Sequence, residues 1–104
     1  SGLIFIPLQH VIRIEAQGNY SNIYLAVEGG KGAVRVIKAT KTIKEYEDLL
    51  PEILFCRIHN SHIINLSKIV EYQKGRGGTV VMEGGGEIEV ATRRRDEFLR
   101  RLLK

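Results

Sequence analysis

Four hydrogen-bonding side chains, Arg57, His59, Asn60 and Ser61, fall within a five-residue stretch after an apolar segment. Arginine donates in a planar fork, asparagine both donates and accepts, and histidine and serine can do either. Groups of this kind bind phosphates and the edges of nucleic-acid bases. The same residue types also satisfy backbone groups in turns that follow strands. Residue types alone therefore leave two interpretations open, a binding surface and a simple turn.

A second cluster, Arg93-Arg94-Arg95, directly follows a predicted strand. With Thr92 as N-cap, the three arginines occupy the first helical turn, where each exposed positive charge opposes the helix dipole by ~0.3–1 kcal/mol. Local rules are most often broken at functional sites, and a docked anion would make this arrangement favourable. The alternative is a helix that begins later, near Asp96, with the arginines free in solvent. We favour the anion-binding interpretation.

Strand parity sorts the first cluster. In a strand, Cys56 points inward, whereas Arg57, His59 and Ser61 face outward. Asn60 follows the last apolar residue and is expected at the exposed strand end. The same parity places Cys56 and His59 on opposite faces, which argues against a nucleophile–base pair. We expect Cys56 to be a buried structural residue.

Other chemistry finds little support in the sequence. The glycine-rich segment 29–32 lacks the spacing of a phosphate-binding loop and the helix that should follow it. The histidines His10, His59 and His62 do not form a metal-binding spacing with cysteines or carboxylates. We therefore predict no catalytic site, no metal and no cofactor.

The elements that must position these side chains are mostly strands. Alternating apolar and polar residues or β-branched runs predict strands at 4–6, 11–15, 20–27, 33–38, 54–58, 70–73, 79–83 and 87–91. A tight turn is expected near 65–67, and a hairpin loop at 74–78. A capping box at Thr42 and Glu45 begins a helix that Pro51 stops. A second helix spans about 93–103, with an apolar stripe of Phe98, Leu99, Leu102 and Leu103. The fold class is mostly β (α+β), with two short helices.

Composition sets broad limits. The 104 residues suffice for one domain, and the net charge of +4 with a pI near 9.4 suits a polyanionic partner. A single cysteine favours a reducing cytoplasm, and no apolar run approaches the ~20 residues of a membrane span. Residues 1–2 (Ser-Gly) are typical of a cleavage scar from an expression tag, so we expect residues 1–104 to be one domain of a longer protein.

Several ordered blocks resemble the LytTR domain over nearly the whole chain, from about 12 to 103. The most specific block is R-x-H-x-S-x-x-x-N, which begins at Arg57 and follows a Leu-Pro. The other blocks are 14–16 (IEA), 18–20 (GNY), the helix at 42–50 and 89–94 (EVATRR). The resemblance implies an elongated array of small antiparallel β-sheets with short helices. It also implies a bacterial DNA-binding effector domain downstream of a receiver domain, which reads successive major grooves through loops.

The resemblance also implies contact residues. A first reading loop would contain Asn19, Tyr20, Ser21 and Asn22, with Ser21 where the family often places a base-reading residue. A second group would be Arg57, His59, Asn60 and Ser61. A third would be Arg93, the best candidate for a bidentate guanine contact, with Arg94 beside it. Lower-tier candidates for phosphate contacts are Lys41, Lys74 and Arg76.

These observations together predict a cytoplasmic bacterial transcription regulator of the two-component type. Its partners would be double-stranded DNA and the upstream receiver domain, with dimerisation on tandem DNA sites and no membrane. A different class also fits a small basic β domain, namely a non-catalytic protein-interaction or ligand-sensing module. Salt-titrated binding to random duplexes distinguishes the two classes.

Overall fold

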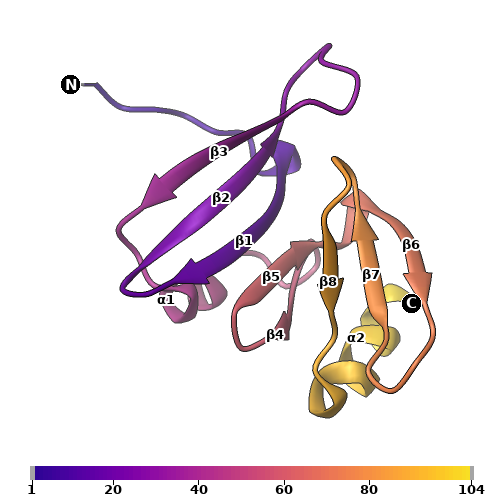
Figure 1. Cartoon of the computed structure of the whole chain (residues 1–104). Coiled ribbons are helices and arrows are strands. Elements are labelled where there is room, and N and C mark those ends of the chain that lie inside the picture. The colour runs from indigo at the N-terminus through magenta and orange to yellow at the C-terminus, as the bar shows by residue number, and fades with distance from the viewer. Residues whose placement is uncertain (1, 104) are drawn as a thin grey trace.

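The computed structural model describes residues 2–103, which form an elongated body of 44 × 31 × 23 Å (Figure 1). The strands are β1 (Val11–Gln17), β2 (Tyr20–Ala26), β3 (Val34–Ala39), β4 (Phe55–His59), β5 (His62–Asn65), β6 (Ile69–Gln73), β7 (Thr79–Met82) and β8 (Glu87–Glu89). The helices are α1 (Ile43–Leu49) and α2 (Arg95–Leu102), with 3₁₀ turns η1 (Leu8–His10), η2 (Leu66–Lys68) and η3 (Thr92–Arg94). The predicted mostly β architecture of small antiparallel sheets with two short helices is confirmed.

The first sheet has five strands in the order β3-β2-β1-β5-β4, and every pairing described is antiparallel. In β2 every second residue is buried, which confirms the predicted alternation. The buried face packs against α1 through Ile43. The capping box of α1 is formed as predicted: Glu45 N donates to Thr42 Oγ1 at 3.3 Å, and Thr42 N donates to Glu45 Oε1 at 3.1 Å.

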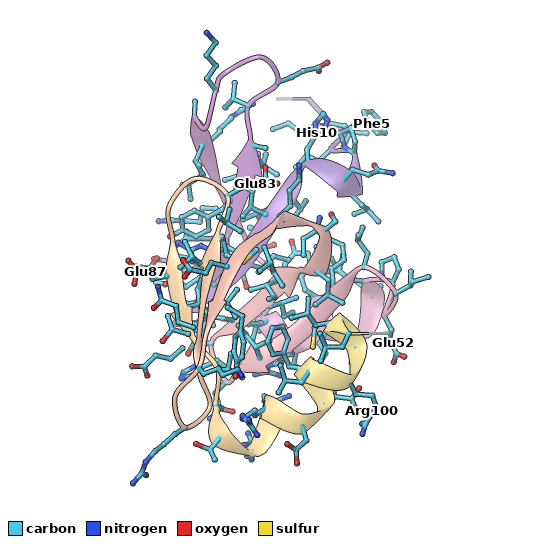
Figure 2. All side chains as sticks on the ribbon, turned by 90° about the vertical axis from the view of Figure 1, so that its right-hand side faces the viewer. Phe5, His10, Glu52, Glu83, Glu87 and Arg100 are labelled. Atoms are coloured by element: carbon cyan, nitrogen blue, oxygen red, sulfur yellow. The ribbon has the colours of Figure 1, made fainter. Side chains whose placement is uncertain are left out.

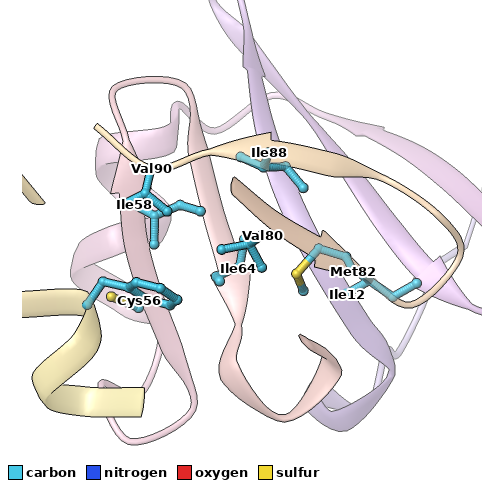
Figure 3. Packing of buried hydrophobic residues seen from close by; sticks show 9 residues of the cluster. Ile12, Cys56, Ile58, Ile64, Val80, Met82, Ile88 and Val90 are labelled. Carbon is cyan, nitrogen blue, oxygen red and sulfur yellow. The ribbon is translucent and has the colours of Figure 1, made fainter. Parts of the chain in front are cut away.

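The second sheet, β6-β7-β8, shares one core with part of the first sheet. Figure 3 shows Ile58 and Ile64 from the first sheet packed beside Val80 and Val90 from the other side. Phe98 of α2 closes this core and is fully buried. Burying several such apolar side chains contributes about 1.5–3 kcal/mol for each one, which holds the two sheets in a fixed relation.

Backbone and side-chain bonds fasten the C-terminal part to β4. Ala91 N donates to the carbonyl of Ile58 at 2.8 Å, immediately after β8 ends. Arg101 of α2 donates to the carbonyl of Phe55 at 2.6 Å. The segment that leads into α2 is therefore held beside the β4–β5 hairpin, although Ala91 lies 33 residues after Ile58 in the sequence.

The tight turn predicted near 65–67 is confirmed as η2, and a buried asparagine organises it. Asn65 Oδ1 accepts from both the backbone N and the hydroxyl of Ser67, at 2.9 and 2.7 Å. Its Nδ2 donates to the carbonyl of Val11 at 2.8 Å. A fully buried amide with these partners costs little to bury, because its hydrogen bonds replace those to water.

Three expectations about the chain ends are wrong. Residues 4–6 form no strand, because no neighbouring strand pairs with them, and Phe5 is 87% exposed, far from α2 in Figure 2. Leu103 is also exposed, beyond the last turn of α2. Thr92 is not the N-cap of α2, which begins at Arg95 after the separate turn η3. Within residues 2–103, neither α1 nor α2 is long and apolar enough to cross a membrane.

Candidate nucleic-acid interface

Four connecting segments open on the lower side of Figure 1, and we call them the loop edge. They are residues 18–19 between β1 and β2, 60–61 between β4 and β5, 74–78 between β6 and β7, and 92–94 after β8. The three groups of residues singled out in the sequence lie in or beside these segments. The fold therefore gathers on one side what the sequence spreads over more than 70 residues.

Arg57 stabilises the β4–β5 turn through hydrogen bonds to its backbone. Its Nη2 donates to the carbonyl of Asn60 at 2.5 Å, and its Nε donates to the carbonyl of His59 at 3.3 Å. Its Nη1 pairs with Glu47 of α1 at 2.9 Å. Only 13% of the Arg57 side chain is exposed. Arg57 therefore shapes the turn and presents little of itself to a ligand.

His59 and Ser61 complete the turn. Strand β4 ends at His59 rather than running on to Ser61, and a bulge interrupts its pairing with β5 between Arg57 and His59. His59 Nδ1 accepts from the backbone N of Ser61 at 3.1 Å. The neighbouring ring of His62 lies 5.4 Å away, and burial lowers the pKa of His62. The stretch is therefore a turn, as one interpretation held, and this turn exposes Asn60, which leaves the binding-surface interpretation open as well.

Asn60 in the β4–β5 turn and Arg93 in η3 lie side by side on the loop edge. Arg93 Nη2 donates to Asn60 Oδ1 at 2.6 Å, and both residues are exposed. Arg93 lies in η3, which is anchored one residue earlier by the bond from Ala91 to β4. The second and third groups of predicted contacts thus form one surface, with a charge-assisted bond between them.

The alternative of a helix that begins near Asp96 is close to the observed start, because α2 begins at Arg95 and η3 holds Arg93 and Arg94. The other arginines of the cluster are not free in solvent, however. Arg94 and Arg95 are partly buried, and the Nε atom of each is buried with no hydrogen-bond partner among the described residues. Burial, and then the charges of Arg57 and Arg93, lower the pKa of Arg94. Asp96 and Glu97 occupy the first turn of α2, where negative charge suits the helix dipole.

The β1–β2 turn carries the first predicted group, and one of its members must be corrected. Ser21 is fully buried, and its hydroxyl donates to the carbonyl of Lys41 at 2.9 Å. It faces α1 rather than solvent, so it cannot contact a ligand directly in this fold. Asn19 is exposed, and Asn22 donates to Gln17. Tyr20 lies under the ammonium of Lys38, 4.5 Å from ring centroid to nitrogen.

Comparison with known protein families decides the classification. The family described as LytTr DNA-binding domain matches residues 1–103. The chain belongs to the LytTR family. A solved structure, the LytTr DNA-binding domain of a Bacillus cereus protein named as a methyl-accepting/DNA response regulator, superposes with a TM-score of 0.78. That superposition covers 96% of this chain and 86% of the other, at 22% identity, so it supports the fold alone. A search of curated proteins finds no match.

Within this LytTR domain, the lower-tier basic residues are all exposed. Lys74 and Arg76 lie in the β6–β7 loop of the loop edge. Lys41 lies before α1, where its carbonyl accepts the bond from Ser21. Exposed lysine and arginine side chains of this kind suit phosphate contacts, which position a protein on DNA without reading its sequence.

The remaining chemical candidates of this LytTR domain stay structural. Cys56 is buried, and desolvation raises its pKa, which suppresses the reactive thiolate. Within residues 2–103, no group of three histidine, cysteine, aspartate or glutamate side chains is placed to hold a metal.

Sequence reasoning missed Glu47, which pairs with Arg57 at the base of the turn. A local signal was present: Glu47 follows the buried Ile43 by four residues, so both lie on one face of α1. A carboxylate on the inward side of an amphipathic helix usually has a partner. The identity of that partner, ten residues further along in another element, had no local signal.

Proposed function

We propose that this LytTR domain binds specific DNA sequences as the effector domain of a bacterial transcriptional response regulator. The loop edge would enter the major groove, with Arg93 and Asn60 reading bases. The observation that carries the proposal is the Arg93–Asn60 pair. Both residues are exposed, both are of types that read bases, and a hydrogen bond holds them together on the loop edge. Base readers must be held in position to discriminate, and this pair is tied to β4 on both sides.

The chemistry of the pair favours guanine. Asn60 Oδ1 accepts from Arg93, so the amide's other polar group, the Nδ2 donor, remains to meet a base. Arg93 keeps Nη1 and Nε as further donors. A surface of donors matches the O6 and N7 acceptors that guanine presents in the major groove. The preferred site should therefore contain a guanine at the position that Arg93 meets.

The charge distribution and size support a DNA partner. Exposed Arg93, Lys74 and Arg76 belong to segments of the loop edge, and the exposed acids Glu89 and Asp96 flank η3 in the sequence. Glu83 and Glu87 lie higher in Figure 2, away from α2. The basic side chains of the loop edge would meet phosphates, and these contacts would supply salt-dependent affinity. The longest dimension of the whole body is 44 Å, which exceeds the ~34 Å repeat of the duplex, so the domain is large enough to lie along one helical turn of DNA.

The wider context belongs to the same proposal and is supported by family membership. We infer a non-catalytic domain without a cofactor, downstream of a receiver domain in a cytoplasmic regulator. Pairs of such regulators would bind as dimers on tandem sites.

Selection of bound duplexes from a random pool tests the proposed function. We expect one enriched motif containing a guanine, and tighter binding to it than to a scrambled duplex at every salt concentration from ~50 to ~200 mM. A pool with no enriched motif would overturn sequence-specific binding. If, in addition, no duplex were retained at ~50 mM salt, a protein-interaction or ligand-sensing domain would replace the proposal.

A further inference from the structure

Glu47 is an acid placed behind the turn that carries Asn60, close to Arg57 and Arg94. Its carboxylate bonds Arg57 at 2.9 Å, and one-third of its side chain is exposed. Its charge acts on Arg94 as well, where it opposes the lowering of the Arg94 pKa by Arg57 and Arg93. An acid in this position repels DNA phosphates. Its presence beside a DNA-binding surface therefore needs a reason other than affinity.

The hydrogen bonds supply that reason. One guanidinium nitrogen of Arg57 donates a hydrogen bond to Glu47, and the other two donate to the carbonyls of His59 and Asn60. Glu47 thus fixes the Arg57 fork from the helix side, and the fork fixes the turn backbone. The planar guanidinium couples these bonds, because all of its donors move together.

The turn backbone in turn sets the position of the base-reading pair. Asn60 accepts a hydrogen bond from Arg57 on its backbone carbonyl and one from Arg93 on its side-chain oxygen. A shift of the turn would carry the Asn60 side chain with it and would break or lengthen its bond to Arg93. The contacts therefore run from Glu47 of α1 through Arg57 to the Asn60–Arg93 pair.

We propose that Glu47 is a positioning residue for sequence discrimination, acting through Arg57 on the Asn60–Arg93 pair without touching DNA. This inference rests on the proposed function. It has an unusual consequence, because removing Glu47 lowers affinity for the preferred site while leaving affinity for scrambled DNA unchanged or higher. A general loss of structure would weaken both, and a simple loss of negative charge would strengthen both.

Asp48 offers a matched control on the same helix. It is 64% exposed, bonds Lys44 at 3.2 Å and makes no bond to the turn, so Asp48→Ala removes the same charge. Lys44 also lies 3.8 Å from Glu47 Oε1, so both variants lose one carboxylate beside Lys44 and only Glu47→Ala loses the bond to Arg57. We expect Glu47→Ala to reduce the ratio of affinities for selected and scrambled duplexes about tenfold, the size of one compromised bidentate base contact. Asp48→Ala should leave the ratio within about twofold. Glu47→Gln keeps an acceptor for Arg57 and should recover part of the ratio.

A second measurement separates positioning from an independent effect. In an Arg93→Ala background the pair no longer exists, so Glu47→Ala should change the affinity ratio less than about twofold further. Thermal unfolding of each variant checks that the fold is retained, and Glu47→Gln serves in place of Glu47→Ala if the alanine variant unfolds.

The possible outcomes distinguish the two proposals. If the unmodified domain does not discriminate between duplexes, the proposed function fails. If it discriminates and Glu47→Ala keeps the full ratio, or matches Asp48→Ala, the positioning role of Glu47 is overturned. A full tenfold effect of Glu47→Ala in the Arg93→Ala background would overturn it as well.

Discussion

The two predicted reading regions of this LytTR domain are built differently. In the β1–β2 region, Asn22 and Tyr20 contact residues of their own sheet, Gln17 and Lys38, whereas the buried Ser21 bonds the carbonyl of Lys41 before α1. At the other region, Asn60 and Arg93 come from turns 33 residues apart and are bonded to each other. A bond between two segments that are distant in the sequence fixes the position of both side chains, which base discrimination requires. The comparison teaches that sequence choice should be concentrated at the Asn60–Arg93 pair, with the β1–β2 turn contributing mainly affinity.

The largest expected effect comes from Arg93→Ala. Loss of a bidentate contact should cost about 1–3 kcal/mol on the selected duplex and should relax base preference at one position. The measurement is a titration of selected and scrambled duplexes followed by fluorescence anisotropy. Arg93→Lys is the control, since it keeps the charge and loses the planar fork. An equal drop on both duplexes would mean that Arg93 contacts only phosphate.

Ser21→Ala tests the other region through stability. The buried hydroxyl bonds the Lys41 carbonyl, so we expect the free energy of unfolding to fall by about 1 kcal/mol in a denaturant titration. The affinity ratio for selected over scrambled DNA should not change. A changed ratio in a variant of undiminished stability would restore Ser21 as a contact and contradict the comparison.

Asn19→Ala combined with Asn22→Ala should have a smaller effect, below about 1 kcal/mol. Because these side chains are not anchored to a second segment, we expect similar losses on selected and scrambled duplexes. The same anisotropy titrations provide the measurement. A loss confined to the selected duplex would show that the β1–β2 turn reads sequence as strongly as the Asn60–Arg93 pair.

The smallest effect at fixed salt is expected for Lys74→Ala and Arg76→Ala. Each exposed cation that neutralises a phosphate should contribute about 1 to the slope of log affinity against log salt concentration. We expect each substitution to reduce this slope by about that amount, with no change in preferred sequence. An unchanged slope would place the β6–β7 loop outside the interface.

Local rules predicted much of this fold. The capping box at Thr42 and Glu45, the alternation along β2 and the hairpin around residues 74–78 are all confirmed. Each depends on residues close in the sequence, where spacing reports directly on geometry. The expected strand at 4–6 is not formed. Apolar composition favours a strand, but it does not tell whether a neighbouring strand is available to pair with it.

The candidate site was less accessible to sequence reasoning. Along β2, Ser21 shares the buried face with Ile23 and Leu25, so strand parity gives its position correctly and the contact implied by the family resemblance does not. The bonds of Arg57 to Glu47 and of Arg93 to Asn60 join separate elements, so no local spacing indicates them. Sequence therefore predicted contact residues that the fold brings to the loop edge, whereas their pairing depended on tertiary packing.

A double-mutant cycle between Asn60 and Arg93 measures whether the two side chains recognise DNA as one unit. Affinities for selected and scrambled duplexes are measured for Asn60→Ala, Arg93→Ala and the double variant. If the two side chains read DNA as one pair, their coupling free energy should be about 1 kcal/mol or more on the selected duplex and near zero on the scrambled one. Additive effects on the selected duplex would show that the two residues act independently, which contradicts this account.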